Sequence, residues 1–362
     1  MPDLHTIHHD GVSHNPLGAG SYVFRKNLIT HLTQYCNSKP RILLHIGAQP
    51  NSSPHMGTLV SFAVAFALAK RIRDDPSTLS ADIMISLDLV DTAPSEQFTK
   101  DGVIYQRSQR HTGEMKKYID DFKHVMQLLH SYSGIPWRIR NQEEFLMSHP
   151  DIHTIVEDIV RRRDELAKSL APETGCLAIR STCPHAECGL SDKHGIRNVY
   201  NDDDKTIVFH CPYHGQYIVD TKTSSGVSRL EFNAPLRNLL RAMTFTRDTD
   251  ATWIRVTGAD YAGYYQEQLL WRHISDPLLI FYSPLILDWS GAKLSKSLYV
   301  EEGAYKYFDT QNLDYLVSYE KFKQHGKDFR IIYDEVTNWV QEPFRLFRSY
   351  SVYYIDGLFP GH

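Results

Sequence analysis

The sequence predicts an α/β fold in which a parallel sheet is covered by helices. Residues 41–46 form a short apolar run, residues 47–54 are rich in turn-forming residues, and residues 56–73 are apolar, Ala-rich and free of proline. This order is typical of a strand, a loop and a helix. Residues 82–90 follow as a second apolar run. Strands that alternate with helices favour a parallel sheet with right-handed crossovers.

The rest of the chain continues this pattern, except for one segment whose composition differs. Apolar residues at helical spacing predict a helix over residues 115–132. Short segments rich in Cys, His, Gly and Asp then occupy residues 174–219, which indicates a small insertion and not a further part of the sheet. After it we expect a strand at 253–256, a helix at about 264–273 and a strand at 278–287.

The chain length of 362 residues suits two domains, or one large domain with an insertion. The predicted division has five segments: an N-terminal extension (1–40), the first half of the α/β domain (41–173), a Cys/His metal-binding insertion (174–220), the second half of the α/β domain (221–300) and a short helical, aromatic-rich tail (301–362). This tail is too short to form a large second domain.

The net charge of -4 and the pI near 6.5 exclude a protein that is basic over its whole surface. A contact with a nucleic acid must therefore come from a local patch, and DNA is not an expected partner. Four basic stretches are candidates, and each alone is expected to be a solvated face: 107–117, 138–140, 161–163 and 229–241. The polar N-terminus lacks the pattern of a secretion signal, and no apolar run reaches the roughly 18 residues of a membrane span. We expect a soluble, cytoplasmic protein without a membrane partner.

Three of the five cysteines lie close together in the sequence with a histidine nearby. Cys183 and Cys188 are separated by four residues, and Cys211 precedes His214 by three positions. Such a set suits a closed structural Zn²⁺ site better than disulfides in a reducing compartment. Reduced cysteines without a metal are the alternative, and His185 or His210 could replace His214 as a ligand.

The strongest functional signal is a pair of motifs far apart in the chain. The first, Pro-His-Met-Gly-Thr at 54–58, begins the predicted helix, where a glycine allows a nucleotide to approach the backbone and His55 can donate to a phosphate. The second, Lys-Leu-Ser-Lys-Ser at 293–297, lies on a predicted loop that follows a strand. Its lysines, Lys293 and Lys296, are suited to stabilise the charge that develops on pyrophosphate.

Acidic residues near the predicted strand ends are candidates for substrate binding. Asp260 follows Gly258 after a strand and could bind hydroxyl groups, but it could equally cap a turn. Asp88, Asp91 and Glu96 lie on or just after the second strand, where a carboxylate could pair with a basic substrate side chain. Caps and solvated loop charges are the alternative for these three residues.

Together the two motifs resemble the HIGH and KMSKS signatures of class I aminoacyl-tRNA synthetases. The first corresponds to residues 55–58 and the second to residues 293–297, and the resemblance covers about residues 41–300. Thr58 stands where the family has its final histidine, which removes one phosphate-facing imidazole, and Leu294 replaces a methionine. The arrangement looks most like that of the class I lysyl-tRNA synthetases, which also carry Cys/His zinc modules between their sheet halves.

The resemblance implies a Rossmann-like sheet, and it implies catalytic roles for His55, Lys293 and Lys296. If adenylation is retained, it also implies the use of ATP with Mg²⁺. The residues that it assigns to binding of ATP or the aminoacyl group are Gly47, Pro54, Gly57, Thr58, Gly258, Asp260, Ser295 and Ser297.

Two enzymatic functions fit this resemblance. The short segment after residue 300 leaves no room for a large anticodon-binding domain, which favours a tRNA-dependent enzyme similar to the fungal arginine-containing cyclodipeptide synthases. Such an enzyme forms peptide bonds from aminoacyl-tRNA, here with a basic amino acid such as arginine. The alternative is a stand-alone ATP-dependent ligase that adenylates a basic amino acid, similar to a class I lysyl-tRNA synthetase that lacks an anticodon domain. A nucleotidyltransferase and a catalytically silent tRNA-binding protein are less favoured. The expected partners are the acceptor end of aminoacyl-tRNA and amino acids.

Overall fold

The computed structural model describes residues 27–79, 82–263, 265–275, 278–294 and 305–360. Ser295, Lys296 and Ser297 therefore lie outside the described residues, as does most of the expected N-terminal extension. In the part of the chain that is described, no helix combines the length and the apolar character needed to cross a bilayer.

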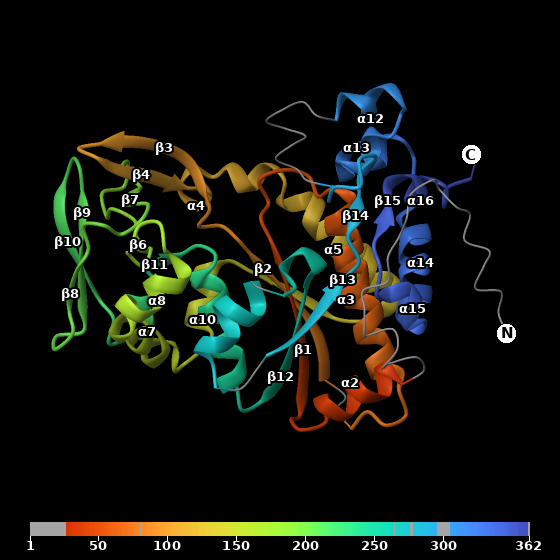
Figure 1. The fold of residues 1–362 in the computed structure, drawn as a ribbon, viewed down its shortest axis with the longest axis horizontal. Helices are drawn as coiled ribbons and strands as arrows, with labels where there is room; N and C mark the ends of the chain where they lie inside the picture. The colour runs from red at the N-terminus through yellow and green to blue at the C-terminus, as the bar shows by residue number, and fades with distance from the viewer. Residues whose placement is uncertain (1–26, 80–81, 264, 276–277, 295–304, 361–362) are drawn as a thin grey trace.

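A five-stranded parallel sheet forms the centre of the molecule, in the order β13-β12-β1-β2-β5 (Figure 1). Its strands are β1 (Arg41–Ala48), β2 (Asp82–Leu89), β5 (Trp137–Arg140), β12 (Ala251–Gly258) and β13 (Leu279–Ser283). From β1 the chain adds β2 and β5 on one side and then returns to add β12 and β13 on the other. The order of the strands therefore reverses between β1 and β12. The predicted α/β fold with a parallel, Rossmann-like sheet is confirmed.

Helices cover both faces of this sheet because its strands are apolar on both sides. Along β1, the side chains of Ile42, Leu44 and Ile46 join one core and that of Leu43 joins the other. The first core includes α3 (Met56–Asp74), α5 (Ile119–Ser133) and α14 (Phe329–Gln341), and the second includes α7 (Ile152–Arg161), α8 (Arg163–Leu170) and α10 (Leu236–Arg247).

Helix α3 matches the predicted helix almost residue for residue. It is buried nearly all round, since the sheet, α5, α14 and α2 (Leu28–Cys36) pack around it. That environment explains why its sequence is apolar and Ala-rich without a polar stripe. The helix begins next to His55, its N-cap residue, and ends at Asp74, two residues before Pro76.

The expected insertion consists of short strands and is joined to the first half of the domain. The hairpin of β3 (Pro94–Lys100) and β4 (Val103–Ser108) pairs through β4 with β7 (Leu190–Asp192) in one antiparallel sheet. A second sheet contains β8 (Val199–Asn201), β9 (Thr206–Cys211) and β10 (Gly215–Asp220), and a third pairs β6 (Ile179–Ser181) with β11 (Leu230–Phe232). Figure 1 shows these sheets gathered at the end of the molecule farthest from α14.

Three expected elements differ in detail. The predicted helix at 264–273 is a π-helical turn at Tyr265–Leu270 followed by a 3₁₀ turn at Trp271–His273. The predicted strand at 278–287 is broken into β13 and β14 (Ile286–Leu287), because Pro284 cannot donate to a strand ladder. A 3₁₀ turn at Glu114–Lys117 precedes α5, so that helix starts later than expected.

The tail is helical, as expected, and it packs against the first core. Strand β14 pairs with β15 (Tyr350–Ser351) from the tail, which fixes the end of the chain beside the sheet. The tail helices are α12 (Lys306–Thr310), α13 (Tyr319–Gln324), α14, α15 (Pro343–Leu346) and α16 (Val352–Asp356). The remaining short helices are α4 (Gln109–Thr112), α6 (Gln142–Met147) and α9 (Ser224–Val227).

Candidate functional site

A pocket of about 160 Å³ opens at the carboxyl ends of β1 and β12. In open α/β sheets, the crevice at the point where the strand order reverses is where ligands bind. Three separate segments of the chain line this pocket, and they bring together seven residues that the sequence predicted for one site: Gly47, His55, Gly57, Thr58, Gly258, Asp260 and Lys293.

The imidazole of His55 is held by the start of α3. Its Nδ1 accepts a hydrogen bond from the backbone N–H of Gly57 at 3.1 Å, which places the ring proton on Nε2. Nε2 lies 3.4 Å from Oγ1 of Thr58. A β-carbon at residue 57 would come within 2.9 Å of Cε1 of His55, so a glycine is needed for the ring to sit there. His55 can therefore present an N–H donor beside the positive end of the helix dipole.

Lys293 and Asp260 form an ion pair at the pocket. Lys293 follows a tight turn in which the carboxylate of Asp288 accepts from the backbone N–H groups of Ser290 and Ala292. The next residue, Leu294, is buried and donates its backbone N–H to the carbonyl of Ile286 at 2.8 Å. The turn and this bond fix the position from which the lysine reaches the pocket.

Ser61 is among the pocket residues that were not predicted from the sequence. Ser61, one turn into α3, and Ser283, at the end of β13, have their hydroxyl oxygens 2.8 Å apart. Serines in a helix and at a strand end give no distinctive sequence signal. Pro54, which was expected to bind ATP, is not among the lining residues, and its carbonyl accepts the backbone N–H of Tyr319 at 2.8 Å. That bond ties the tail to the start of the first motif.

Asp88 is completely buried at the end of β2. Its carboxylate accepts from Nε and Nη2 of Arg140 at 2.9 and 3.1 Å, and it lies 3.3 Å from Nε2 of His45. Burial alone would raise the pKa of Asp88, but Arg140 and His45 hold it below its usual range. Burial lowers the pKa of His45 to about 4, so that imidazole is neutral at pH 7. Asp88 therefore belongs to an internal ion-pair network.

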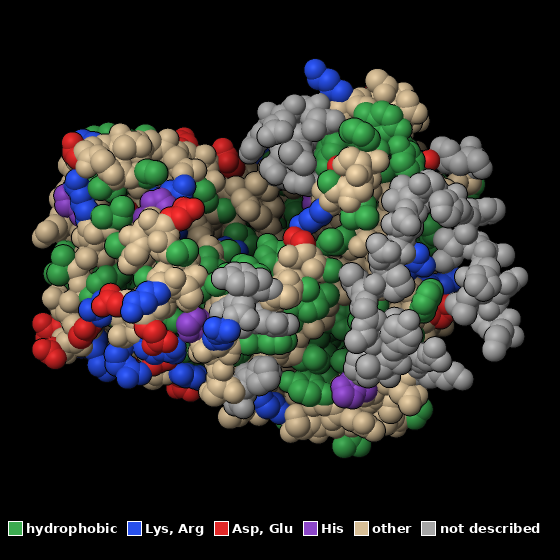
Figure 2. Space-filling model, viewed as in Figure 1, with side chains coloured by type: hydrophobic (Ala, Val, Ile, Leu, Met, Phe, Trp, Pro, Cys, Tyr) green, Lys and Arg blue, Asp and Glu red, His purple; other side chains and the backbone are tan. Residues whose placement is uncertain are grey.

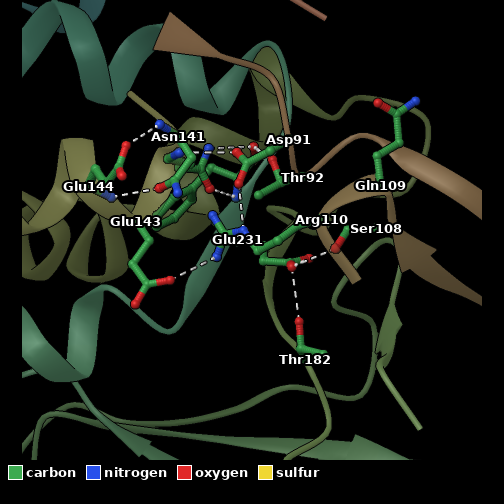
Figure 3. Close-up of polar contacts among 12 residues, drawn as sticks. Asp91, Thr92, Ser108, Gln109, Arg110, Asn141, Glu143, Glu144, Thr182 and Glu231 are labelled. Carbon is green, nitrogen blue, oxygen red and sulfur yellow. Dashed lines mark hydrogen bonds and ion pairs between the residues drawn. The ribbon is translucent and has the colours of Figure 1, made fainter. Parts of the chain in front are cut away.

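Asp91 and Glu96 are also engaged within the chain. Figure 3 shows Arg110 between the carboxylates of Asp91 and Glu143, and it shows Glu231 reaching Ser108 and Thr182. The other oxygen of Asp91 accepts the backbone N–H at the start of α6. Glu96 is exposed on β3 and pairs with Arg107 at 2.6 Å. The binding of a substrate side chain by Asp88, Asp91 and Glu96 stays a prediction.

The four expected metal ligands come together in the insertion. The ligand atoms of Cys183, Cys188, Cys211 and His214 all lie within 4.8 Å of one another. Cys188 and Cys211 have their sulfur atoms 3.6 Å apart, close to the roughly 3.8 Å expected of two thiolates on one tetrahedral Zn²⁺. None of these cysteines forms a disulfide, and all three are buried. The donor set and spacing fit zinc.

The alternative histidines have other contacts. The ring of His185 stacks on that of His214 with centroids 3.9 Å apart, and His210 lies 3.4 Å from the hydroxyl of Tyr105. His214 is the histidine that lies with the three cysteines, since its Nδ1 is 3.5 Å from the sulfur atoms of Cys183 and Cys211. Four protein ligands close a tetrahedral site, so the cluster can hold the short strands together but leaves no position for a substrate.

The basic stretches have different environments. Over α7 and α8, acidic and basic side chains intermingle on the face drawn in Figure 2, and Arg161, Arg162 and Arg163 each pair with a carboxylate. The expectation that every stretch is a solvated face was wrong for two of them. Arg140, Arg237 and Arg241 are buried, because their stretches lie in β5 and α10 inside the fold.

No family model matches the sequence, and no curated protein matches it. Solved structures with a similar arrangement include a protein described as an arginyl-tRNA synthetase from Campylobacter jejuni, with a TM-score of 0.31, 10% identity and coverage of 74% of this chain and 61% of that one. Two others are a glutamate-tRNA synthetase from Elizabethkingia anophelis (TM-score 0.33, 12% identity, 72% and 54% coverage) and a glutamate tRNA ligase from Elizabethkingia meningosepticum (0.33, 13%, 72% and 53%). The chain thus spans about half to three fifths of their lengths. Likenesses this distant show neither the family nor the activity of the chain.

Proposed function

We propose that the chain is an enzyme that activates an amino acid with ATP, and that the pocket between β1 and β12 is its active site. One observation carries this proposal. Motifs from opposite ends of the α/β domain, with phosphate-binding chemistry in both, line one pocket at the point where the strand order reverses. A fold alone would not support an activity, but the placement of His55, Asp260 and Lys293 does.

In this reaction an α-carboxylate oxygen of the amino acid attacks the α-phosphorus of ATP. A new phosphorus–oxygen bond forms, the bond to the β-phosphate oxygen breaks, and pyrophosphate leaves with the electron pair. His55 would donate its Nε2–H to an oxygen of the α-phosphate as negative charge develops there. The start of α3 adds the field of its helix dipole. Mg²⁺, bound with the nucleotide, would neutralise charge on the phosphates.

The ion pair between Lys293 and Asp260 has two consequences for this scheme. Asp260 keeps the ammonium group at the pocket before the nucleotide arrives. When triphosphate is present, Lys293 can turn to the phosphates, and the carboxylate of Asp260 can then accept hydrogen bonds from ribose hydroxyls. Lys296 would act from the same loop, but it lies outside the described residues.

A second candidate is the formation of a peptide bond from aminoacyl-tRNA, as in a cyclodipeptide synthase. The pairing of Lys293 with Asp260 fits this reaction as well, because it needs no triphosphate to draw the lysine away from the carboxylate. The amine of one aminoacyl group would attack the ester carbonyl of another, and the tRNA hydroxyl would leave with a proton. Attack by the remaining amine on the second ester would close the ring and release the second tRNA. The terminal adenosine of tRNA would occupy the pocket in this case.

Product analysis separates the two candidates. The purified protein is mixed with a tRNA pool, amino acids, ATP and a charging extract, with and without RNase, and the products are identified by mass spectrometry. Pyrophosphate release by the purified protein that depends on an amino acid and survives RNase supports activation with ATP. A cyclic dipeptide that disappears with RNase supports the second candidate. Neither product from folded protein would refute both.

A further inference from the structure

Three buried arginines lie on α10 and β12, and none of them is among the site residues predicted from the sequence. Arg237 and Arg241 are one helical turn apart on α10, and Arg255 lies on β12 opposite His45 of β1. Their residues are only 9%, 3% and 7% exposed. We call Arg237, Arg241 and Arg255 the arginine cluster.

The arginine cluster has more donors than acceptors. Among the described residues, Nε of Arg237, Nε and Nη2 of Arg241 and Nη1 of Arg255 are buried without a hydrogen-bond partner. The carboxylate of Asp88 comes within 3.7 Å of Nε of Arg241, but Arg140 already occupies both of its oxygens. Arg140 and Arg241 thus share the carboxylate of Asp88, and Asp91 is paired with Arg110.

The cluster is next to the pocket. A β-carbon at Gly47, which lines the pocket, would lie 3.8 Å from Nη1 of Arg241. On another side, Tyr261 lines the pocket and its ring packs edge-on against Tyr265 at 5.1 Å. The hydroxyl of Tyr265 accepts a hydrogen bond from Asn238, the neighbour of Arg237 on α10, at 2.6 Å.

The cluster lies on the opposite face of the sheet from His55. Along β1, Ile46 packs into the core that contains α3, whereas His45 contacts Phe245 of α10 with ring centroids 5.1 Å apart. Arg255 is the register partner of His45 across the two parallel strands. Phosphates bound at the start of α3 would therefore not contact the arginine cluster, which would be available to another part of the substrate.

Burying guanidinium groups without a counterion is unfavourable. The pKa values of two of these arginines are lowered accordingly. Burial, and after it the charge of Arg241, lowers the pKa of Arg237 to about 9, and burial lowers the pKa of Arg241 to about 10. A carboxylate placed among them would relieve this cost with bidentate, charge-assisted hydrogen bonds. A lysine or arginine side chain at the same place would add a fourth cation to the cluster.

We propose that the arginine cluster is a subsite for a carboxylate side chain, so that the amino acid handled in the pocket is acidic. The inference rests on the proposed function, because it assigns the amino acid that shares the pocket with adenosine. The proposed substrate is an acidic amino acid and not the basic one that the sequence suggested. Asp88 and Asp91 are neutralised within the chain, whereas the arginine cluster is not.

Binding of paired analogues tests this subsite directly. The full chain is titrated in a calorimeter with the 5′-sulfamoyl adenosines of glutamate and glutamine, of aspartate and asparagine, and of lysine. At least one acid should bind about 100-fold more tightly than its amide, because a site built for a charged group rejects its uncharged isostere. Arg237→Met and Arg255→Met should remove this preference. Arg247→Met, at the exposed end of the same helix, should keep it.

The outcomes separate this inference from the proposed function. If the acids and amides bind equally, or the lysyl analogue binds most tightly, the carboxylate subsite is wrong although the pocket binds an adenylate. If no analogue binds, the proposed function is wrong. Thermal unfolding then tests the cluster independently. If the guanidinium of Arg237 is buried without a counterion, Arg237→Met should melt at or above the wild-type temperature. A clear fall in melting temperature would show that Arg237 is structural and would overturn the inference.

Discussion

Replacing Gly57 by alanine should separate stability from activity. The new β-carbon would lie 2.9 Å from Cε1 and 3.1 Å from Nδ1 of His55, whereas ordinary contacts begin at 3.4 Å. The imidazole must therefore move by several tenths of an ångström, and the hydrogen bond from the backbone of residue 57 to Nδ1 is strained or lost. The helix itself should not suffer, because alanine is favoured over glycine in a helix by up to about 1 kcal/mol.

We expect Gly57→Ala to keep or raise the melting temperature and to lower ATP–pyrophosphate exchange about 10- to 100-fold. Displacement of a group that stabilises the transition state costs rates of this order. His55→Ala in the same assay gives the size of the complete loss. A folded Gly57→Ala protein with wild-type exchange would refute the assignment of His55 to the α-phosphate.

Three further perturbations test other parts of the structure. Asp88→Asn should lower the free energy of unfolding by about 3–5 kcal/mol, because Arg140 loses its buried counterion. Asp120→Asn, at an exposed carboxylate, should change it by less than about 0.5 kcal/mol. Denaturant titration followed by tryptophan fluorescence compares the two variants. Cys183→Ser should lose bound zinc and melt at a lower temperature, and metal analysis that finds no zinc in the wild-type protein would contradict the metal site. Burial lowers the pKa of His45 from 6.5 to about 4, so the unfolded chain binds a proton at this histidine more tightly than the folded chain does. The free energy of unfolding should therefore be highest above pH 6.5 and should fall by up to about 3 kcal/mol towards pH 4. His45→Gln should flatten this part of the curve of unfolding free energy against pH.

The local elements around the pocket could be predicted from the sequence. A strand, a turn and a proline-free helix at 41–73 leave short-range signals, and β1 and α3 appear where those signals place them. The spacing of Cys183, Cys188, Cys211 and His214 likewise pointed to one cluster, and their ligand atoms converge. In both cases the signal comes from residues close together in the chain.

The partners of charged side chains could not be predicted, because tertiary contacts decide them. Asp88 meets Arg140 only through the pairing of β2 with β5, so the sequence could not show that this carboxylate is already neutralised. The basic stretch at 229–241 predicts a solvated face, although apolar residues surround Arg237 and Arg241 on α10. An arginine pair one turn apart within an apolar helix is the signal that could have identified them as buried.

ATP–pyrophosphate exchange tests the central claim most directly. The purified full chain is incubated with ATP, labelled pyrophosphate and each amino acid in turn, with and without tRNA. We predict exchange that depends on an amino acid, falls in His55→Ala and falls in Lys293→Ala, since both side chains line the pocket between β1 and β12. Folded protein that shows no exchange with any amino acid, with or without tRNA, would contradict the claim that this pocket activates amino acids with ATP.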